Sequence, residues 1–349
     1  MRYNLEPTEK LEATLKEFLV FIGAALTLSA VALAQSAPSQ SAPPQARLPF
    51  ALPLESVTVT VQKPSDATIR DFVKTRAVPT YVLGRMARWR LKICPLTIGL
   101  GDKYAKYVTQ RVRDIATAVG VPVNPDPGCR PNVEVVFTTT PQGLMDNVRK
   151  SQPLFLGYHH NAMQAEELAK VVHPIQAWYT TETLDINGTR QVDTGDCGVG
   201  GTTTLNTQTN AGTENGDAAT AGVYQLTLPC AVVVRSNGSR AADGMNSGFY
   251  NVLIVAEPAK LYDHEVGALA DYVTMLALSE PASLGICQEL PSISNMLAPN
   301  CPSVPSRITD GDLAYLRALY KLPGGQFLSA QRDYIRRGMT QVLVTDKGG

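Results

Sequence analysis

A histidine followed by a glutamate opens a segment that begins like a zinc-binding motif. The segment reads HEVGALADYVTMLALSE and runs from His264 to Glu280. In the motif HExxH, two histidines one helical turn apart hold the metal, and the glutamate between them polarises the zinc-bound water. Here Ala268 stands at the second histidine position. His264 and Glu265 therefore supply one candidate ligand and one candidate base, but not a complete site.

The remaining histidines, His159, His160 and His173, lie far from this segment in the sequence. A zinc site usually needs three protein ligands in its catalytic form, so these residues would have to converge on His264. In a metalloenzyme, zinc would be the cofactor, with His264 as ligand and Glu265 as base. The sequence favours the alternative, in which no residue is catalytic and no metal or other cofactor is bound.

A shift of six residues aligns the same helix better with the longer motif HExxHxxGxxH. Asp271 then stands at the glutamate position, while Ala270, Thr274 and Glu280 stand at the three ligand positions. The apolar positions of the motif remain apolar here. The metal-binding chemistry is lost, because the alanine at the first ligand position has no donor atom. If a cleft persists beside such a helix, we expect four residues to line it: Asp271, Tyr272, Thr274 and Glu280.

Along the wider sequence, predicted strands alternate with predicted helices. A strand is predicted within 88–100, an amphipathic helix over 102–120, a strand over 132–139, a short helix over 140–150 and a strand over 174–186. Two further strands, within 223–236 and 248–258, are separated by turn-rich sequence and are expected to form an antiparallel pair. Helices follow at 264–280, 309–322 and 329–343, and Thr309 and Asp312 form a capping box.

This order resembles that of zincin metalloproteases, especially the metzincins. In that superfamily a turn of the Ser-x-Met-x kind lies beneath the metal, as Ser292–Met296 would here, and a closing helix runs from a Thr-x-x-Asp start to Leu-Tyr, as Thr309 to Tyr320 would. The resemblance implies an α+β fold in which helices pack on a mixed sheet. The chain also resembles an uncharacterised group of exported bacterial proteins with similar segments, here Arg88-Trp89, Cys94-Pro95, Cys129–Asn132 and Asp271-Tyr272.

The N-terminal region predicts export. Residues 1–34 end in an uncharged apolar run with a small-x-small cleavage pattern and read as a signal peptide; an uncleaved membrane anchor is the alternative. Residues 35–54 are rich in Pro and Ser and predict a flexible tether. A single α+β domain is expected over 55–345, with a flexible Gly/Thr/Asn-rich insertion at 187–222.

The cysteines support an oxidising compartment, the periplasm or the exterior of the cell. Their number is six and none forms a CxxC pair, which favours disulfides over a zinc ribbon. Pairing between sequence neighbours is expected because each pair brackets a compact segment: Cys94 with Cys129, Cys197 with Cys230, and Cys287 with Cys301.

The overall charge limits the classes of partner that the sequence favours. The 31 basic and 31 acidic side chains cancel, so no global field favours nucleic acid, and a membrane is a partner only if the apolar segment stays uncleaved. We expect an exported, non-catalytic protein of the cell envelope that binds a protein or peptide through the former substrate cleft or through the Gly/Thr/Asn-rich loop. Two alternatives are a zinc metalloprotease that uses His264 and Glu265, and a structural envelope protein.

Overall fold

The computed structural model describes residues 63–185, 187, 189–194, 202–208, 223–229 and 244–345 of the 349-residue chain. The chain divides into two units, Met1–Val59 and Thr60–Gly349, and all described residues belong to the second. The predicted signal peptide and the tether lie outside the described residues. Among the described residues, no helix has the length and apolarity that a membrane span requires.

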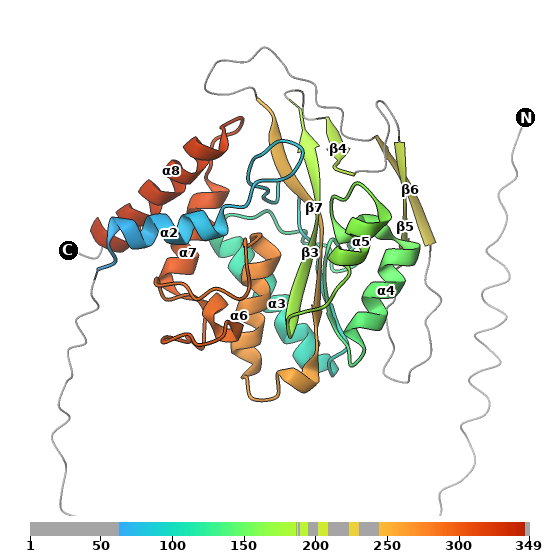
Figure 1. Ribbon diagram of the computed structural model, residues 1–349, viewed down its shortest axis with the longest axis horizontal. Coiled ribbons are helices and arrows are strands. Elements are labelled where there is room, and N and C mark those ends of the chain that lie inside the picture. Colours follow the sequence, from blue (N-terminus) through green and yellow to red (C-terminus); the bar gives the residue numbers. More distant parts are fainter. Residues whose placement is uncertain are drawn as a thin grey trace, which may run out of the picture. The chain divides into compact units, whose positions relative to one another are not determined.

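A five-stranded mixed sheet organises the described part of the chain, in the order β1-β2-β7-β3-β4 (Figure 1). The strands β1 (Pro95–Ile98), β2 (Val133–Phe137) and β7 (Asn246–Ala256) run parallel. The strand β3 (Ile175–Leu184) is antiparallel to β7, and β4 (Arg190–Val192) is antiparallel to β3. The expected α+β class with a mixed sheet is confirmed.

The predicted pairing of the two strands around residue 240 is wrong. The strand β6 (Val223–Pro229) pairs with β5 (Thr202–Gln208) in a separate two-stranded sheet, while β7 lies between β2 and β3. The physical reason is the composition of β7, which is buried on both faces for most of its length and therefore belongs in the interior of a large sheet. The 187–222 insertion, predicted to be flexible, contributes both β4 and β5.

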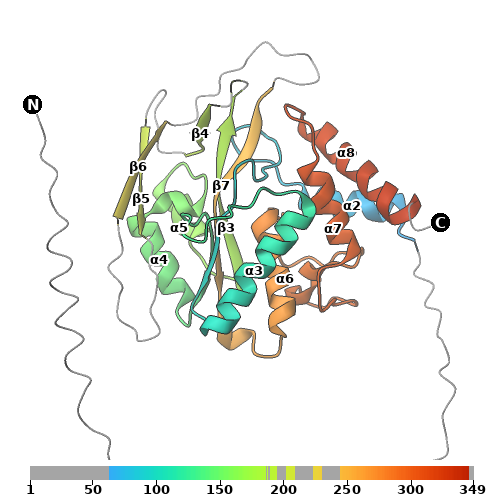
Figure 2. The ribbon, with the colours of Figure 1, turned by 180° about the vertical axis from the view of Figure 1, so that it is seen from behind.

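Two helices cover one face of the sheet side by side, α3 (Asp102–Val119) and α6 (Val266–Leu278), as the front and back views show (Figures 1 and 2). Buried apolar residues recur on α3 at helical spacing, and Gly120 ends the helix in the left-handed conformation at φ 89°. The helix α7 (Asp310–Tyr320) contacts α3 as well. The main core lies between this layer and the sheet.

A thinner layer covers the opposite face of the sheet. It contains α4 (Pro141–Ser151), the 3-10 helix η1 (Pro153–Leu156) and α5 (Ala162–Leu168), and it encloses a smaller apolar cluster around Trp178 of β3. The helix at 140–150 was predicted; α5 was not. Its seven residues, opened by Asn161 as N-cap, are too short for a clear apolar period.

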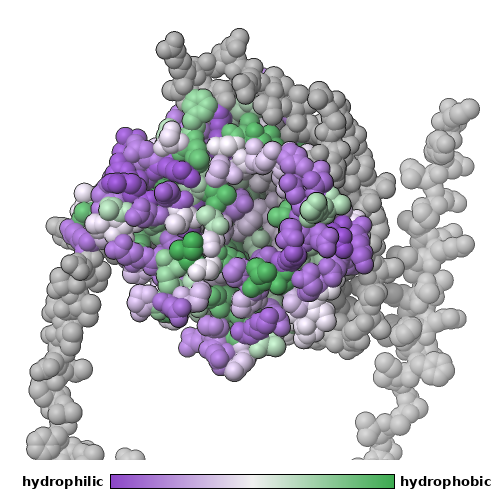
Figure 3. Space-filling view, in the orientation of Figure 1, coloured by the Kyte–Doolittle hydropathy of each residue, from purple (hydrophilic) through white to green (hydrophobic). Residues whose placement is uncertain are grey.

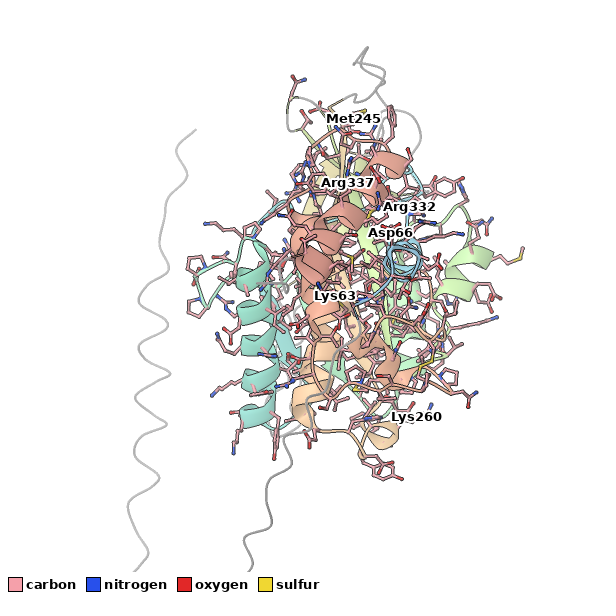
Figure 4. All side chains as sticks on the ribbon, turned by 90° about the vertical axis from the view of Figure 1, so that its left-hand side faces the viewer. Lys63, Asp66, Met245, Lys260, Arg332 and Arg337 are labelled. Atoms are coloured by element: carbon pink, nitrogen blue, oxygen red, sulfur yellow. A yellow bond between two sulfur atoms is a disulfide. The ribbon has the colours of Figure 1, made fainter. Side chains whose placement is uncertain are left out.

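The first and last helices of the domain pack together. Figure 4 looks along α2 (Asp66–Arg76), which packs against α8 (Leu328–Thr340). Asp66 forms an ion pair with Arg336, and Arg332 donates to the carbonyl of Ala77. The remaining short elements are η2 (Pro258–Lys260), η3 (Ile293–Leu297) and η4 (Gln341–Thr345).

Two of the three expected disulfides are confirmed, Cys94–Cys129 and Cys287–Cys301. The third expected pair, Cys197–Cys230, lies outside the described residues. The first bridge ties the chain just before β1 to the chain just before β2, so it holds the starts of two neighbouring strands together.

Removing the first bridge is expected to lower the free energy of unfolding more than removing the second. Loop-closure entropy predicts about 4 kcal/mol for the 35-residue separation of Cys94 and Cys129, and about 3 kcal/mol for the 14-residue separation of Cys287 and Cys301. The two Cys→Ser double variants can be compared by guanidinium unfolding without reductant. A larger loss for the shorter loop would contradict this order.

Candidate functional site

A cleft of 580 Å³ runs beside β3 in the part of the chain that the structure describes. In the space-filling view, apolar residues gather between the polar surface over α2 and α8 and the polar surface over α5 (Figure 3). Four segments and the strand β3 line the cleft: 79–81, 156–158, 167–173 and 280–284, together with Gln176, Ala177, Trp178, Tyr179, Thr181 and, from α6, Leu276.

Part of β3 has no strand partner on its cleft side. The strand β7 pairs with β3 along its whole length, but β4 pairs only with Glu182–Leu184. Thr181 turns its carbonyl to the cleft side, where it accepts the N–H of Asp193. Because backbone directions alternate along a strand, Tyr179 and Ala177 turn their polar backbone groups the same way. From Ile175 to Trp178 this edge therefore has no partner strand among the described residues.

Gly157 marks the end of the open edge. A Cβ at this position would lie 2.7 Å from the carbonyl oxygen of Tyr179, and the residue has φ 88°. Both the close approach and the left-handed backbone require glycine. The backbone of Gly157 therefore covers the edge at Tyr179 and leaves Ala177 as the central open residue.

One wall of the cleft is formed by the end of α6 and the residues that follow it. The hydroxyl of Tyr179 donates to the carbonyls of Leu276 and Ser279, at 3.0 and 3.3 Å, which fixes the end of α6 against β3. Glu280 comes next in the chain and lines the cleft, half-buried. Its burial raises the pKa of its carboxyl group to about 7.

The opposite wall is held by hydrogen bonds between α5 and β3. The indole of Trp178 donates to the carbonyl of Leu168 at 2.6 Å, and the side-chain amide of Gln176 bonds the backbone of Lys170 and Val172. Glu167 and Lys170 form an ion pair at 2.5 Å on the surface of this wall. These polar groups of the wall are thus already hydrogen-bonded or ion-paired within the protein.

An aromatic cluster of Tyr81, Tyr158 and His160 stands at the end of the cleft nearer β4. The two tyrosine rings stack with centroids 4.2 Å apart, and His160 meets each of them edge-on. The hydroxyl of Tyr81 lies 2.7 Å from Nε2 of His160. Tyr81 is 66% exposed, so the cluster offers a flat apolar surface to a ligand.

The histidines do not converge on a metal site. His264 and Glu265 precede α6, with Glu265 at its N-cap position, so neither lies on the helix as the motif requires. His159 is buried and its Nδ1 lies 2.8 Å from the carbonyl of Gly157, while His173 lines the cleft. Among the described residues there is no group of three or more His, Cys, Asp or Glu that could hold a metal. These residues do not fit a zinc ion.

Of the four residues expected along the cleft, only Glu280 is in its lining. Asp271 points to α3, where its carboxylate meets Nε of Arg111 at 2.5 Å and Nη2 at 3.1 Å, and it also accepts the N–H of Ile308 at 2.7 Å. Thr274 donates to the carbonyl of Ala270. Tyr272 is buried, and its hydroxyl has no hydrogen-bond partner among the described residues.

The end of α6 determines which of these residues reach the cleft. Leu276 lies in the last turn of α6 and Glu280 follows the extended residue Ser279, and both line the cleft. Asp271 and Thr274 lie earlier on α6 and are not in the lining. The tyrosines of the aromatic cluster lie outside helices and strands, in segments without an apolar period, so no sequence pattern placed them at the cleft. Comparison of the chain with protein-family models, curated proteins and solved structures finds no match.

Proposed function

We propose that the protein is a non-catalytic binding protein of the cell envelope, which takes an extended peptide segment into the cleft beside β3. The observation that carries the proposal is the open edge of β3 at the floor of a 580 Å³ cleft. An exposed strand edge binds an extended peptide through main-chain hydrogen bonds, and the flanking walls select its side chains. The two disulfides agree with an oxidising compartment.

The dimensions of the cleft suit a short segment. The open edge of β3 extends from Ile175 to Trp178, which corresponds to about 13 Å or about four residues of extended peptide. Such a strand would pair with Ala177 and end near the aromatic cluster, where an apolar side chain could contact Tyr81. The apolar parts of Leu276, Leu284 and Trp178 contribute further burial.

We further propose that the scaffold is a zincin-like fold that has lost its metal ligands. Support comes from the order of elements, in which β1, α3 and β2 precede the longer strands, α6 follows β7, and η3 and the capped helix α7 close the domain. Metal chemistry has no role in this proposal, because the described residues contain no group of three or more His, Cys, Asp or Glu that could hold a metal ion.

Selection of a random nonapeptide library displayed on phage tests whether the cleft binds peptides at all. The full chain is immobilised, and the affinities of synthetic versions of the selected peptides are measured by titration calorimetry. We expect a shared sequence preference and micromolar dissociation constants, which correspond to about 8 kcal/mol of binding free energy. Methylation of one peptide nitrogen at a time should weaken binding at alternate positions, because only alternate N–H groups of an added strand face β3.

Two alanine-to-tryptophan variants, one inside the cleft and one outside it as a control, test whether the peptide binds in the cleft. Ala282 lines the cleft and is exposed, while Ala118 is exposed on α3 and is not in the cleft lining. We expect Ala282→Trp to weaken binding about tenfold or more and Ala118→Trp to leave it unchanged, with both variants keeping the wild-type unfolding midpoint. Equal binding by all three proteins, or the absence of any selected peptide, would refute the proposed function.

A further inference from the structure

Glu280 is the one acidic residue in the lining of the cleft that has neither a hydrogen bond nor an ion pair among the described residues. The other acid, Glu167, is paired with Lys170 at 2.5 Å. The two phenols that face Glu280 are bonded elsewhere: Tyr179 donates to α6, and Tyr315 of α7 donates to the carbonyl of Arg76 at 2.9 Å. A half-buried carboxyl group without a donor is costly unless a ligand supplies one.

The register of an added strand places a side chain at this carboxyl group. Ala177 and Tyr179 both face the main core on the α6 side of the sheet, whereas Trp178 faces the smaller cluster on the α5 side. Side chains directly opposite each other on paired strands share one face. The peptide residue opposite Ala177 therefore points to the α6 side, where Tyr179 spans from β3 to the carbonyl of Ser279, the residue before Glu280.

We propose that Glu280 makes the cleft selective for a peptide with a lysine or arginine side chain at the position opposite Ala177, whose ammonium or guanidinium group binds the Glu280 carboxylate. This inference rests on the proposed function, since it names the ligand of the same cleft. A charge-assisted hydrogen bond in a partly water-excluded cleft contributes more than the same contact on an open surface.

The other charged groups near this position do not replace Glu280. Arg76 of α2 is buried and is faced by Asp312, Tyr272 and Tyr315. Lys170 is paired with Glu167, and His173 lines the cleft at the start of β3. A cationic side chain of the ligand therefore meets one free acidic partner within the cleft lining.

The binding of such a peptide should depend on pH in a defined direction. The carboxyl group of Glu280 has a pKa raised to about 7, so it is largely neutral at pH 6 and ionised at pH 8. A ligand cation prefers the ionised form, so affinity should rise as the pH increases from 6 to 8. The difference between wild-type protein and Glu280→Gln isolates the contribution of Glu280 to the pH dependence.

The test repeats the phage selection at pH 8 with wild-type protein, Glu280→Gln and the control variant Glu289→Gln, which changes an exposed glutamate outside the cleft lining. We expect wild-type protein and Glu289→Gln to select peptides with lysine or arginine at one position. Replacing that residue by norleucine should weaken binding about tenfold to wild-type protein and less than about twofold to Glu280→Gln. The tightening between pH 6 and pH 8 should be present in wild-type protein and absent in Glu280→Gln.

The outcomes separate the two proposals. If no protein selects peptides, the proposed function itself fails. If peptides are selected without a basic preference, or if Glu280→Gln keeps that preference, the function stands and the role of Glu280 is refuted. The folded state of each variant is checked by its unfolding midpoint, which a Glu→Gln change in the cleft lining should leave close to the wild-type value.

Discussion

Replacing Asp312 with alanine is expected to lower the free energy of unfolding by about 4 kcal/mol or more. Its carboxylate is fully buried and accepts hydrogen bonds from the hydroxyl of Ser292 at 2.5 Å and from the backbone N–H groups of Ile293 at 2.9 Å and Thr309 at 3.1 Å. Alanine would leave these donors buried without an acceptor. It would also remove one half of the capping box that begins α7.

Urea unfolding measures this loss, with two variants as comparison. Asp312→Asn keeps one acceptor oxygen and should lose less than Asp312→Ala. Asp310→Ala changes an exposed carboxylate in the same first helical turn and should lose less than about 1 kcal/mol. A similar loss in Asp310→Ala and Asp312→Ala would show that helix-dipole charge, and not the buried hydrogen bonds, is the main contribution of Asp312.

Replacing Asp271 with alanine is expected to lower the free energy of unfolding by about 3 to 5 kcal/mol. The Asp271 side chain is 2% exposed and joins three parts of the chain: α6, Arg111 of α3, and the N–H of Ile308 before α7. The same contact raises the pKa of Arg111. Its loss would leave a half-buried guanidinium and a backbone donor without their acceptor.

A double-mutant cycle separates the ion pair from the rest of the packing. Arg111→Met should also destabilise the domain, because Asp271 would remain as a buried charge without its counter-ion. The double variant Asp271→Ala/Arg111→Met should lose less than the sum of the single losses, with a coupling of about 2 kcal/mol. Unfolding of all four proteins is followed by circular dichroism; additive losses would show that the two side chains stabilise the domain independently.

Local sequence signals are sufficient to predict those helix ends that a capping residue marks. Thr309 and Asp312 predict the capping box that the structure contains, and Gly120 predicts the end of α3. These features depend on residues within one turn of each other, so their chemistry is readable without knowledge of the fold. The two disulfides within the described residues join cysteines 35 and 14 residues apart, and the sequence predicts them because each pair brackets one compact segment.

The cleft could not be derived in this way because it is assembled from distant segments. The apolar pattern of the α6 segment predicts Glu280 as a cleft residue. The open edge of β3, however, depends on how far β4 extends along β3, and the residues of the turn between the two strands do not reveal that length. The prominent pair His264 and Glu265 proved to stand before α6 and not on it, since the helix begins at Val266. Motif letters alone do not fix the helical register on which their chemistry depends.

The recessed position of the open strand edge has a consequence for solubility. An unpaired, flat edge on a protein surface invites edge-to-edge association with the sheet of another molecule. Here α5 and the segment after α6 stand on either side of Ile175–Trp178, and the backbone of Gly157 closes one end. Walls on both sides make this edge less accessible to the sheet of another molecule than an edge on an open surface, which disfavours edge-to-edge association.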